Sequence, residues 1–413
     1  MAKHNKQTLV IGGGPAGMTA AIAAADAGDA VTILERNEKL GKKLYITGKG
    51  RCNLTNICDD EDFFKNVVHN ERFLFSAMSR FNRWDLMGLI EDNGCPLKTE
   101  RGGRVFPVSD KSSDVIKAFT KALDNRGVNV EYGVKVMELI TEKKDDKPMV
   151  TGVKCADGRQ ISAEKIILAS GGNSYKQTGS DGNGYAIAKA LGHNIVAPRP
   201  SLIGLVCRES WPRELSGLTL KNVDVTLFHR GKKIETLRGE VLLTHFGLSG
   251  PVILTMSAYL DDHPDQYALR IDLKPALTDQ QLDTRVLRDF EQMPNKKIDN
   301  ALKKLLPLSL IPAMREMAGI DSETKVNTLD KASRKRLVHL IKNLSFQITD
   351  FFEPNTAIVT SGGIDTREIN PKTMASKLAC GLYFAGEIID VDALTGGFNI
   401  QIAASTGFAA GSH

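Results

Sequence analysis

The feature that most constrains the fold is a glycine-rich turn between two predicted strands near the beginning of the chain. Thr8–Ile11 is typical of a short buried strand, and Val31–Leu34 of a second one. Between them, the alanine-rich stretch from Pro15 to Ala27 predicts a helix. A strand, a glycine-rich turn, a helix and a second strand in this order indicate the first βαβ unit of a doubly wound α/β fold. An ordinary α/β protein with a glycine-rich turn is the alternative.

The spacing inside the turn matches the dinucleotide-binding pattern. Gly12 permits the tight turn, Gly14 leaves the backbone open to a pyrophosphate, and Gly17 lets the helix pack closely on the strand. Glu35 ends the second strand, where the pattern has an acidic residue whose carboxylate accepts hydrogen bonds from both ribose hydroxyls. A carboxylate there repels a 2′-phosphate. The pattern therefore predicts FAD or NAD at this turn, and not NADP.

Composition limits the classes of protein to which the chain can belong. A chain of 413 residues is long enough for two or three domains, and its net charge of +5 is mild. We find no run of about 18 apolar residues and no signal peptide, so we expect no membrane span. The cysteines have no spacing typical of a metal site, which predicts a cytoplasmic protein with free thiols and without a bound metal. They are Cys52, Cys58, Cys95, Cys155, Cys207 and Cys380.

The hydrophobic pattern changes twice along the chain. Predicted strands and helices alternate up to about residue 196. From about residue 350, short predicted strands flanked by glycines occur again, as in the first part of the chain. Between them, stretches such as Val223–Phe228 alternate apolar and polar residues, which favours antiparallel strands. A helical pattern with several prolines follows. We therefore predict one nucleotide-binding domain over 1–196 and 350–413, an inserted β-barrel-like domain over 197–275, and an inserted helical domain over 276–349.

A second glycine-rich region lies close to the C-terminus. The segment Gly386–Asp392 follows a predicted strand, and Gly396–Gln401 precedes a helix of small residues. The N-terminus of such a helix can face the electron-rich side of a flavin and stabilise the anion that forms on reduction. A turn with a purely structural role is the alternative for this region alone.

Together these motifs resemble the HI0933-like family of bacterial NAD(P)/FAD-dependent oxidoreductases, over essentially the whole chain. The segments that carry the resemblance are Gly12–Gly17, Thr47–Asn56, Ser170–Asn173 with Thr178–Gly182, Thr244–Pro251 and Gly386–Gln401. The resemblance implies an α/β fold with a glutathione-reductase-type FAD-binding Rossmann domain and inserted β-barrel-like and small helical domains. It also implies one of several activities: reduction of activated C=C bonds in bile-acid intermediates, oxidation of a small amino ketone, or formation of dihydrouridine in ribosomal RNA.

The resemblance further implies which residues contact FAD. The loop Gly48–Asn53 is expected near the pyrophosphate and the flavin, and the backbone of Val136 near adenine. Glu387 stands where the wider superfamily usually has Asp. The full set of expected FAD-binding residues is Gly12, Gly14, Pro15, Ala16, Gly17, Glu35, Arg36, Lys43, Thr47, Gly48, Arg51, Cys52, Asn53, Val136, Ala169, Ser170, Gly171, Gly386, Glu387, Gly397, Phe398, Asn399 and Ile400.

Three groups of residues allow competing interpretations. Cys52 and Cys58 invite comparison with a redox disulfide, but five residues separate them where disulfide reductases have four, so we expect free thiols. His245 is our candidate proton donor during hydride transfer, and a histidine that orders a turn is the alternative. Arg101 and Arg104 suit either an anionic substrate or a solvated turn.

The predicted helical insert is basic. It holds 13 Lys and Arg against 9 Asp and Glu between residues 276 and 345, and Lys331–Arg336 is its densest patch. A solvated helix face and a nucleic-acid footprint both explain such a patch. Few aromatic residues accompany it, which disfavours base stacking.

These observations lead to an FAD-dependent oxidoreductase in which flavin N5 accepts or gives a hydride. We expect it to reduce an activated C=C or C=O bond of a small molecule. Since only one complete fingerprint is present, NADH or NADPH would bind transiently as the donor. The alternatives are reduction of uridine in ribosomal RNA, oxidation of a small amino ketone by dioxygen, and a flavin-bound protein without turnover.

Overall fold

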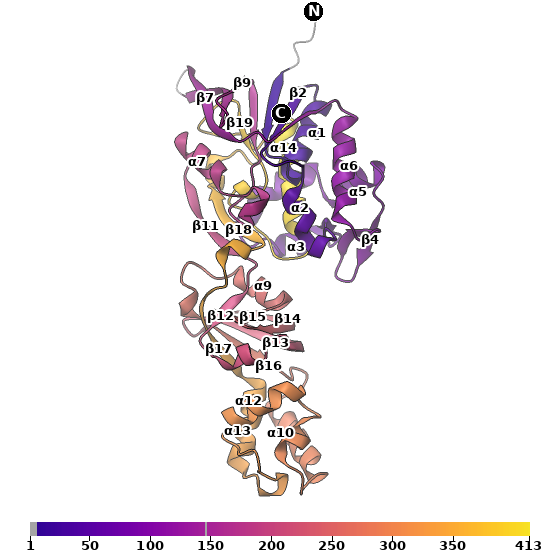
Figure 1. The fold of residues 1–413 in the computed structure, drawn as a ribbon, viewed down its shortest axis with the longest axis vertical. Helices are drawn as coiled ribbons and strands as arrows, with labels where there is room; N and C mark the ends of the chain where they lie inside the picture. Colours follow the sequence, from indigo (N-terminus) through magenta and orange to yellow (C-terminus); the bar gives the residue numbers. More distant parts are fainter. Residues whose placement is uncertain (1–5, 145–146) are drawn as a thin grey trace, which may run out of the picture. The chain divides into compact units, whose positions relative to one another are not determined.

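The computed structural model describes residues 6–144 and 147–413 (Figure 1). The described chain divides into two compact units. The first takes the residues up to Ser201 together with those from Pro354 onward, and the second takes Leu202–Glu353. The first unit is thus interrupted by the second, which is inserted between two of its strands, β11 (Ile195–Ser201) and β18 (Val359–Ile364).

A parallel sheet of five strands forms the centre of the first unit. Its order is β19-β10-β1-β2-β6, and each neighbouring pair is parallel. Its strands are β1 (Gln7–Ile11), β2 (Ala30–Glu35), β6 (Asn129–Tyr132), β10 (Lys165–Leu168) and β19 (Leu382–Phe384). Every residue of β10 is buried, as expected for a strand covered on both faces.

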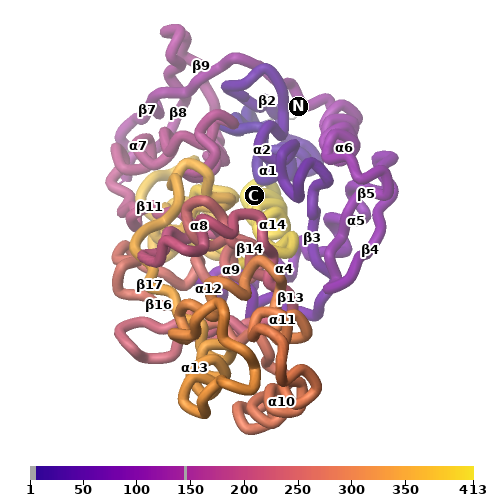
Figure 2. The backbone as a smooth tube through the Cα atoms, turned by 60° about the horizontal axis from the view of Figure 1, so that its bottom comes forward, coloured from indigo at the N-terminus to yellow at the C-terminus, as the bar shows by residue number. Residues whose placement is uncertain are grey.

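Two helices from opposite ends of the chain pack side by side on this sheet. They are α1 (Pro15–Asp26) and α14 (Phe398–Gly411), indigo and yellow in Figure 2. Glycines allow the close approach, because a Cβ atom at Gly407 would lie 2.2 Å from the carbonyl oxygen of Ala16. A Cβ atom at Gly411 would lie 2.2 Å from the carbonyl oxygen of Ala20. The small residues of both helices therefore allow their backbones to touch.

Smaller elements surround the central sheet. The strands β7–β9 form an antiparallel sheet beside β10, β11 pairs with β18, and β3–β5 form a third small sheet. Their bounds are β3 (Thr55–Asn56), β4 (Leu97–Glu100), β5 (Arg104–Pro107), β7 (Val136–Lys144), β8 (Lys147–Cys155) and β9 (Gln160–Ser162). The remaining helices are α2 (Lys42–Ile46), α3 (Asp60–Lys65), α4 (Phe75–Arg80), α5 (Arg83–Asp92), α6 (Ser112–Asp124) and α7 (Asn183–Ala190).

The second unit contains a closed barrel of six strands in the order β12-β15-β14-β13-β16-β17. Inward-facing residues alternate along its strands, and Val225, Leu227, Leu269 and Ile271 are all fully buried. Its strands are β12 (Leu205–Cys207), β13 (Thr219–His229), β14 (Lys232–Thr244), β15 (Gly247–Ser249), β16 (Tyr267–Asp272) and β17 (Leu344–Phe351). Two short helices accompany it, α8 (Trp211–Glu214) and α9 (Pro251–Ser257).

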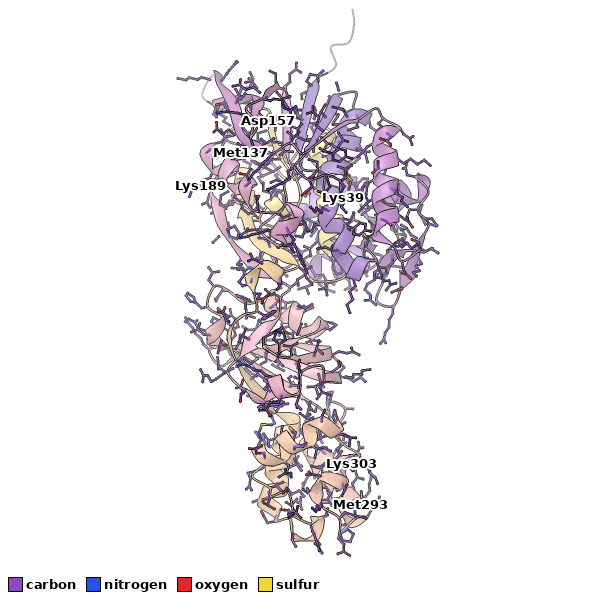
Figure 3. All side chains as sticks on the ribbon, in the orientation of Figure 1. Lys39, Met137, Asp157, Lys189, Met293 and Lys303 are labelled. Carbon is purple, nitrogen blue, oxygen red and sulfur yellow. The ribbon has the colours of Figure 1, made fainter. Side chains whose placement is uncertain are left out.

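A helical part lies between β16 and β17. It contains α10 (Asp279–Glu291), α11 (Ile298–Leu302), α12 (Ile311–Met317) and α13 (Lys331–Lys342). Thr278 and Gln281 form a capping box at the start of α10, and α10 packs on α13. Lys303, labelled in Figure 3, is among the exposed cations of this part. The fold class expected from the sequence, a Rossmann domain with inserted barrel-like and helical parts, is confirmed.

The structure draws the internal boundaries differently from the sequence pattern. Residues 344–349, assigned above to the helical domain, begin the barrel strand β17, whose partners β12 and β16 both precede the helical part in the sequence. Residues 197–201, assigned above to the insertion, belong to β11 in the first unit. Pro198 and Pro200 are tolerated in β11 because it belongs to a two-stranded sheet with an irregular register.

Candidate flavin site

Four strand ends meet at one edge of the parallel sheet. The register pairs Ile11 with both Leu34 and Leu168, and Leu168 with Phe384. The residues that follow, Gly12 among them, therefore leave the sheet together. In an open α/β sheet, ligands bind outside the carboxyl ends of the strands. The structure thus brings the N-terminal fingerprint, Glu35, the segment Ala169–Gly171 and the segment beginning at Gly386 to the same edge.

The three fingerprint glycines differ in what surrounds them. A Cβ atom at Gly17 would lie 1.9 Å from the carbonyl oxygen of Gly12, and one at Gly12 would lie 2.5 Å from the carbonyl oxygen of Ala169. A Cβ atom at Gly14 would meet no atom within 4 Å. Gly12 and Gly17 are therefore required by contacts within the protein. Gly14 instead faces open space, as the pattern predicts for a backbone that an outside group must approach.

The N-terminus of α1 is open to a ligand. Gly14 is its N-cap residue, no side chain caps the helix, and Pro15 is its first residue. The first turn of a helix leaves backbone N–H groups unpaired and carries the positive end of the helix dipole. These groups attract phosphate oxygens.

Glu35 is buried beside the fingerprint. One carboxylate oxygen accepts from the backbone N–H of Gly13 at 2.7 Å, and the other accepts from both the backbone and the side-chain nitrogen of Asn37 at 2.7 Å. A carboxylate has about four acceptor positions, so these bonds leave room for a hydroxyl group. The carboxylate also fixes the turn itself.

Arg36 directly follows β2, Val136 is the first residue of β7, and both contact residues at or near α7. The Arg36 guanidinium pairs with Asp181 at 2.6 Å and donates to the carbonyl oxygen of Gly179 at 3.2 Å. The carbonyl oxygen of Val136 accepts from Nδ2 of Asn183 at 2.8 Å. Asp181 lies in the Thr178–Gly182 segment that carries the family resemblance, but the sequence does not reveal these two pairings, because Asp181 and Asn183 lie far along the chain from the residues that they contact.

A partly buried ion pair joins two predicted site residues that are 344 positions apart. Lys43 on α2 donates to Glu387 at 2.7 and 2.9 Å and to Oγ of Ser174 at 2.6 Å. The backbone N–H of Thr360 donates to the same carboxylate at 2.8 Å. Burial by itself raises the pKa of Glu387, but the charge of Lys43 and these hydrogen bonds outweigh it and lower that pKa. Glu387 is therefore a carboxylate that its neighbours hold in place.

The loop after α2 has a strained backbone and packs on the C-terminal turn. Gly48 and Cys52 have positive φ angles, 57° and 61°. The side-chain amide of Asn53 is oriented so that both its nitrogen and its oxygen have hydrogen-bond partners. In this orientation its oxygen accepts from the backbone N–H of Gly397 at 3.2 Å. Thr55 donates to Gln401 on α14 at 2.7 Å. The loop expected from the Gly-Arg-Cys-Asn motif thus lies directly against the N-terminus of α14, where Phe398, Asn399 and Ile400 begin the helix.

Arg51 directs its side chain to a neighbouring small sheet. Its guanidinium pairs with Glu100 and with Asp110, and it lies 4.2 Å from the centre of the Phe106 ring. Two carboxylates already satisfy the charge of Arg51. Arg51 therefore anchors the loop to β4 and β5, and only the backbone of Arg51 remains available to a ligand.

The cysteines behave as plain thiols. All six are free, and Cys52 is fully buried, which raises the pKa of its thiol to about 12. A thiol with such a pKa remains protonated near neutral pH and is a poor nucleophile. In the part of the chain that the structure describes, no cluster of three or more potential metal ligands occurs.

Two buried hydroxyl groups lie near this edge of the parallel sheet, and only one of them was expected from the sequence. Oγ of Ser170 and the hydroxyl of Tyr185 have no hydrogen-bond partner among the residues that the structure describes. Buried polar groups are nearly always paired, so such atoms mark places where a ligand completes the hydrogen bonding. Ser170 was expected at the site, whereas Tyr185 was not. Tyr185 is a buried aromatic residue of α7, and no motif distinguishes it from a core residue.

His245 and the basic patch belong to the second unit. His245 is exposed in the turn between β14 and β15, and its ring meets those of Phe246 and Phe352 edge-on, at 5.1 and 5.7 Å between centres. In α13, Arg334 is bonded to Asp283 at 2.8 Å, and Arg336 donates to the carbonyl oxygen of Ala318 at 3.0 Å. Two of the four cations of the patch therefore have structural roles, and Lys331 and Lys335 remain exposed.

Comparison with known proteins agrees with this fold. The family model described as the HI0933-like protein Rossmann domain matches residues 6–413. The chain is 32% identical over 407 residues to a 3-dehydro-bile acid delta(4,6)-reductase of Clostridium scindens, with 97% of each chain covered. It is 30% identical over 405 residues to a ribosomal RNA dihydrouridine synthase of Haemophilus influenzae, covering 98% of this chain and 97% of the relative.

A solved structure supports the same fold. The 3-ketosteroid-delta4-(5alpha)-dehydrogenase of Rhodococcus jostii superposes with a TM-score of 0.54 at 17% identity, over 99% of this chain and 96% of the other. In the described residues, no helix is both long and apolar enough to span a membrane. From its sequence, its fold and its relatives, the chain belongs to the HI0933-like family and is an FAD-dependent oxidoreductase.

Proposed function

We propose that the enzyme reduces a C=C bond conjugated to a carbonyl group, with NADH or NADPH as the electron donor. The observation that carries the proposal is full-length similarity to two reductases whose names describe this chemistry. A 3-dehydro-delta(4,6) bile acid and the uracil ring are both conjugated carbonyl systems. Both accept a hydride at the carbon β to the carbonyl.

The residues at the sheet edge fit FAD. We assign the pyrophosphate to Gly12–Gly17 and the N-terminus of α1, because Gly14 faces open space and the helix is uncapped. We assign the adenosine ribose to Glu35. The unpaired hydroxyls of Ser170 and Tyr185 would complete the cradle. When bound, FAD supplies a hydride through its N5 atom.

The C-terminal half of the site has its own tasks in this proposal. Glu387, held by Lys43, would contact the ribityl chain. The N-terminus of α14, beginning at Phe398, would hold the flavin ring and favour negative charge on it. Gly397, whose φ is 99°, brings the backbone of this helix end against Thr55 and so sets its position.

The electron donor is inferred from the sequence. The chain carries one complete fingerprint, and FAD occupies it in this proposal. A nicotinamide donor would therefore bind transiently and leave before the substrate. We retain His245 as a candidate proton donor, and a cytoplasmic location stays a prediction from the cysteines.

Anaerobic reduction tests the proposal directly. The purified protein is mixed with NADH or NADPH while the flavin absorbance is followed, and the reduced enzyme is then offered 4-androstene-3,17-dione, unmodified ribosomal RNA or dioxygen. We expect rapid bleaching by one nicotinamide and rapid reoxidation by a conjugated carbonyl compound. Protein that contains no flavin and takes up none would contradict FAD binding. Reoxidation by dioxygen alone would favour an oxidase.

Reduction of uridine in ribosomal RNA is the second candidate, favoured by the relative from Haemophilus influenzae and by exposed Lys331 and Lys335. Phosphate contacts weaken steeply as salt rises. RNA binding that falls about tenfold or more between 50 and 200 mM salt, and that weakens in K331Q/K335Q, would support this candidate. Similar binding by that variant would argue against a role for the patch.

A further inference from the structure

A guanidinium group without an acidic partner lies near the C-terminal loop of the flavin site. Arg199, on β11, is half-buried, and among the described residues no carboxylate lies within 4.0 Å of its nitrogens. Among the described residues, the side chain of Arg199 makes one hydrogen bond, from its Nη2 to Nε2 of His69 at 3.1 Å. A guanidinium has five N–H donors, so most of those of Arg199 remain for a ligand or solvent.

The hydrogen bonds determine the protonation of His69. Arginine only donates, so Nε2 of His69 accepts and Nδ1 carries the proton. Nδ1 then donates to Oδ1 of Asp392 at 2.6 Å. Asp392 is fully buried, and the hydroxyls of Ser361 and Ser201 lie 3.3 and 3.4 Å from its two oxygens. The ring of His69 is therefore held between a carboxylate and the guanidinium.

A second carboxylate nearby does not neutralise Arg199. Asp390 forms no ion pair with it and accepts from Nδ2 of Asn70 at 3.0 Å. Burial, together with the charge of Asp392, raises the pKa of Asp390 by more than Asn70, His69 and Arg199 lower it. Asp390 therefore feels the charge of Arg199 from a distance, but no described carboxylate pairs directly with the guanidinium.

The chain Arg199–His69–Asp392 is fixed to the start of α14. Ala393, next to Asp392, donates its N–H to Asn399 at 3.0 Å, and its carbonyl accepts from Asn399 at 2.6 Å. The backbone N–H of Val68 donates to the carbonyl oxygen of Asp392 at 2.8 Å. Asn399 is the second residue of α14. Every one of these residues lies in the first unit, close to the helix end assigned to the flavin ring.

We propose that Arg199 is a catalytic residue that binds the carbonyl oxygen of a conjugated carbonyl substrate, with His69 and Asp392 as positioning residues. This proposal rests on the proposed function. A hydride, which bound reduced FAD would supply, adds to the β carbon, and the C=C electron pair shifts so that the carbonyl oxygen becomes an enolate oxygen. The α carbon then takes a proton, for which His245 is the candidate donor under the proposed function. The N–H donors of Arg199 stabilise the negative oxygen, a task that suits preorganised donors in a half-buried site.

Reoxidation kinetics test the role of Arg199. Enzyme reduced with stoichiometric dithionite is mixed anaerobically with 4-androstene-3,17-dione, and the return of the flavin absorbance is timed. We expect R199Q to lower the second-order rate constant by about 100-fold or more, as the loss of an oxyanion donor does. R199K keeps the charge without the planar fork, so we expect a loss of about tenfold. The control R159Q alters an exposed arginine paired with Asp157 and Glu131, and we expect no change.

Ligand binding gives a readout without turnover. The probe is 4-nitrophenolate, a conjugated oxyanion, added to the oxidised holoenzyme and followed by its own absorbance. We expect its Kd to rise about tenfold in R199Q and to be unchanged in R159Q. A double-mutant cycle tests His69. H69Q should slow reoxidation about tenfold in the wild-type background and hardly at all in R199Q, because a positioning residue acts only through its partner.

The outcomes separate this proposal from the proposed function. Equal Kd values and equal reoxidation rates in wild type and R199Q would overturn the role of Arg199 and leave the reductase assignment intact. Nitrophenolate binding that depends on Arg199, together with no reoxidation by the steroid or by ribosomal RNA, would overturn the reductase assignment and leave the anion site. Failure of the wild type to bind nitrophenolate would also overturn the role of Arg199.

Discussion

The two glycine-rich turns of the flavin site each precede a helix, yet they are held in place by different contacts. At the first turn, Gly17 packs on Gly12, and Glu35 binds Gly13, so all of these contacts lie within the first βαβ unit. At the second, Gly397 packs on Thr55, which comes from the other end of the chain. The first turn is therefore mostly a local structure, although Gly12 also lies against the carbonyl oxygen of the distant Ala169. The second exists only when distant parts of the chain have come together.

The largest effect is expected from changing Gly17. G17A places a Cβ atom 1.9 Å from the carbonyl oxygen of Gly12, so α1 must move away from β1. We expect the free energy of unfolding to fall by about 3 kcal/mol, as in other overpacked interiors, measured by urea denaturation of the FAD-free protein. G14A is the matched control, since its Cβ meets no atom within 4 Å. Equal losses in both variants would contradict the distinction between the two glycines.

A larger side chain at Gly14 should affect the cofactor more than the fold. G14V fills the space in front of the α1 N-terminus. We expect its affinity for FAD to fall at least about 100-fold, which corresponds to about 2.7 kcal/mol, while the FAD-free protein unfolds at a similar urea concentration. Binding is measured by titrating the FAD-free protein with FAD. Normal FAD affinity in G14V would place the pyrophosphate elsewhere.

The ion pair between Lys43 and Glu387 connects the regions of the two turns. E387Q leaves Lys43 without its carboxylate, and we expect a loss of stability of about 2 kcal/mol at pH 7. Because folding lowers the pKa of Glu387, its contribution is present above the unfolded value of 4.5 and is lost as pH falls through the lower folded pKa. E387Q should therefore show a weaker acid dependence of unfolding than the wild type.

The double variant K43M/E387Q separates pairing from burial. It removes both charges, so we expect it to recover part of the stability that E387Q loses. Chemical denaturation between pH 4 and pH 7 compares four proteins: the wild type, K43M, E387Q and the double variant. If the double variant were as unstable as the sum of both single variants, the two side chains would not act as a pair.

Lys165 attaches the end of α14 to the central sheet. Its fully buried ammonium donates to the carbonyl of Gly411 at 2.6 Å and to that of His413. Burial lowers its pKa from 10.5 to about 8. The folded state therefore binds fewer protons than the unfolded state between pH 8 and 10.5, and stability should rise with pH in that window by up to about 1.4 kcal/mol per unit. K165M should lose this rise, which thermal unfolding at pH 7.5 and 9.5 would detect.

The smallest effect is expected at Cys58. Since Cys52 is a buried thiol with a raised pKa and Cys58 is free, we expect no exchange of electrons between these two cysteines and the flavin. C58A should change the rate of flavin reduction by less than about twofold. A strong loss of the reductive half-reaction in C58A would restore the disulfide interpretation.

Local patterns predicted much of the first turn but little of the side-chain partnering. The strand–turn–helix–strand order and Glu35 were evident because all are close in sequence. Arg51 was expected at the cofactor, but its guanidinium is held by Glu100 and Asp110, which no motif marks. Residues 344–349 were assigned to helices, and only their pairing with β12 and β16 makes them a strand. The chain Arg199–His69–Asp392 was not foreseen, because its members are 130 and 323 positions apart.

Short-range sequence patterns were enough to establish the α/β class, the family and the expected adenosine end of the site, because backbone geometry at Gly12–Gly17 depends on neighbouring residues. The flavin end depends on long-range packing, since α14, the loop before β3 and the Lys43–Glu387 pair meet only after the sheet has formed. The same packing settles which charged side chains are already satisfied and which remain free to act. The sequence alone does not show which arginine, Arg51 or Arg199, has acidic partners. One has two carboxylates beside it, and the other has a histidine that leaves its charge for a substrate.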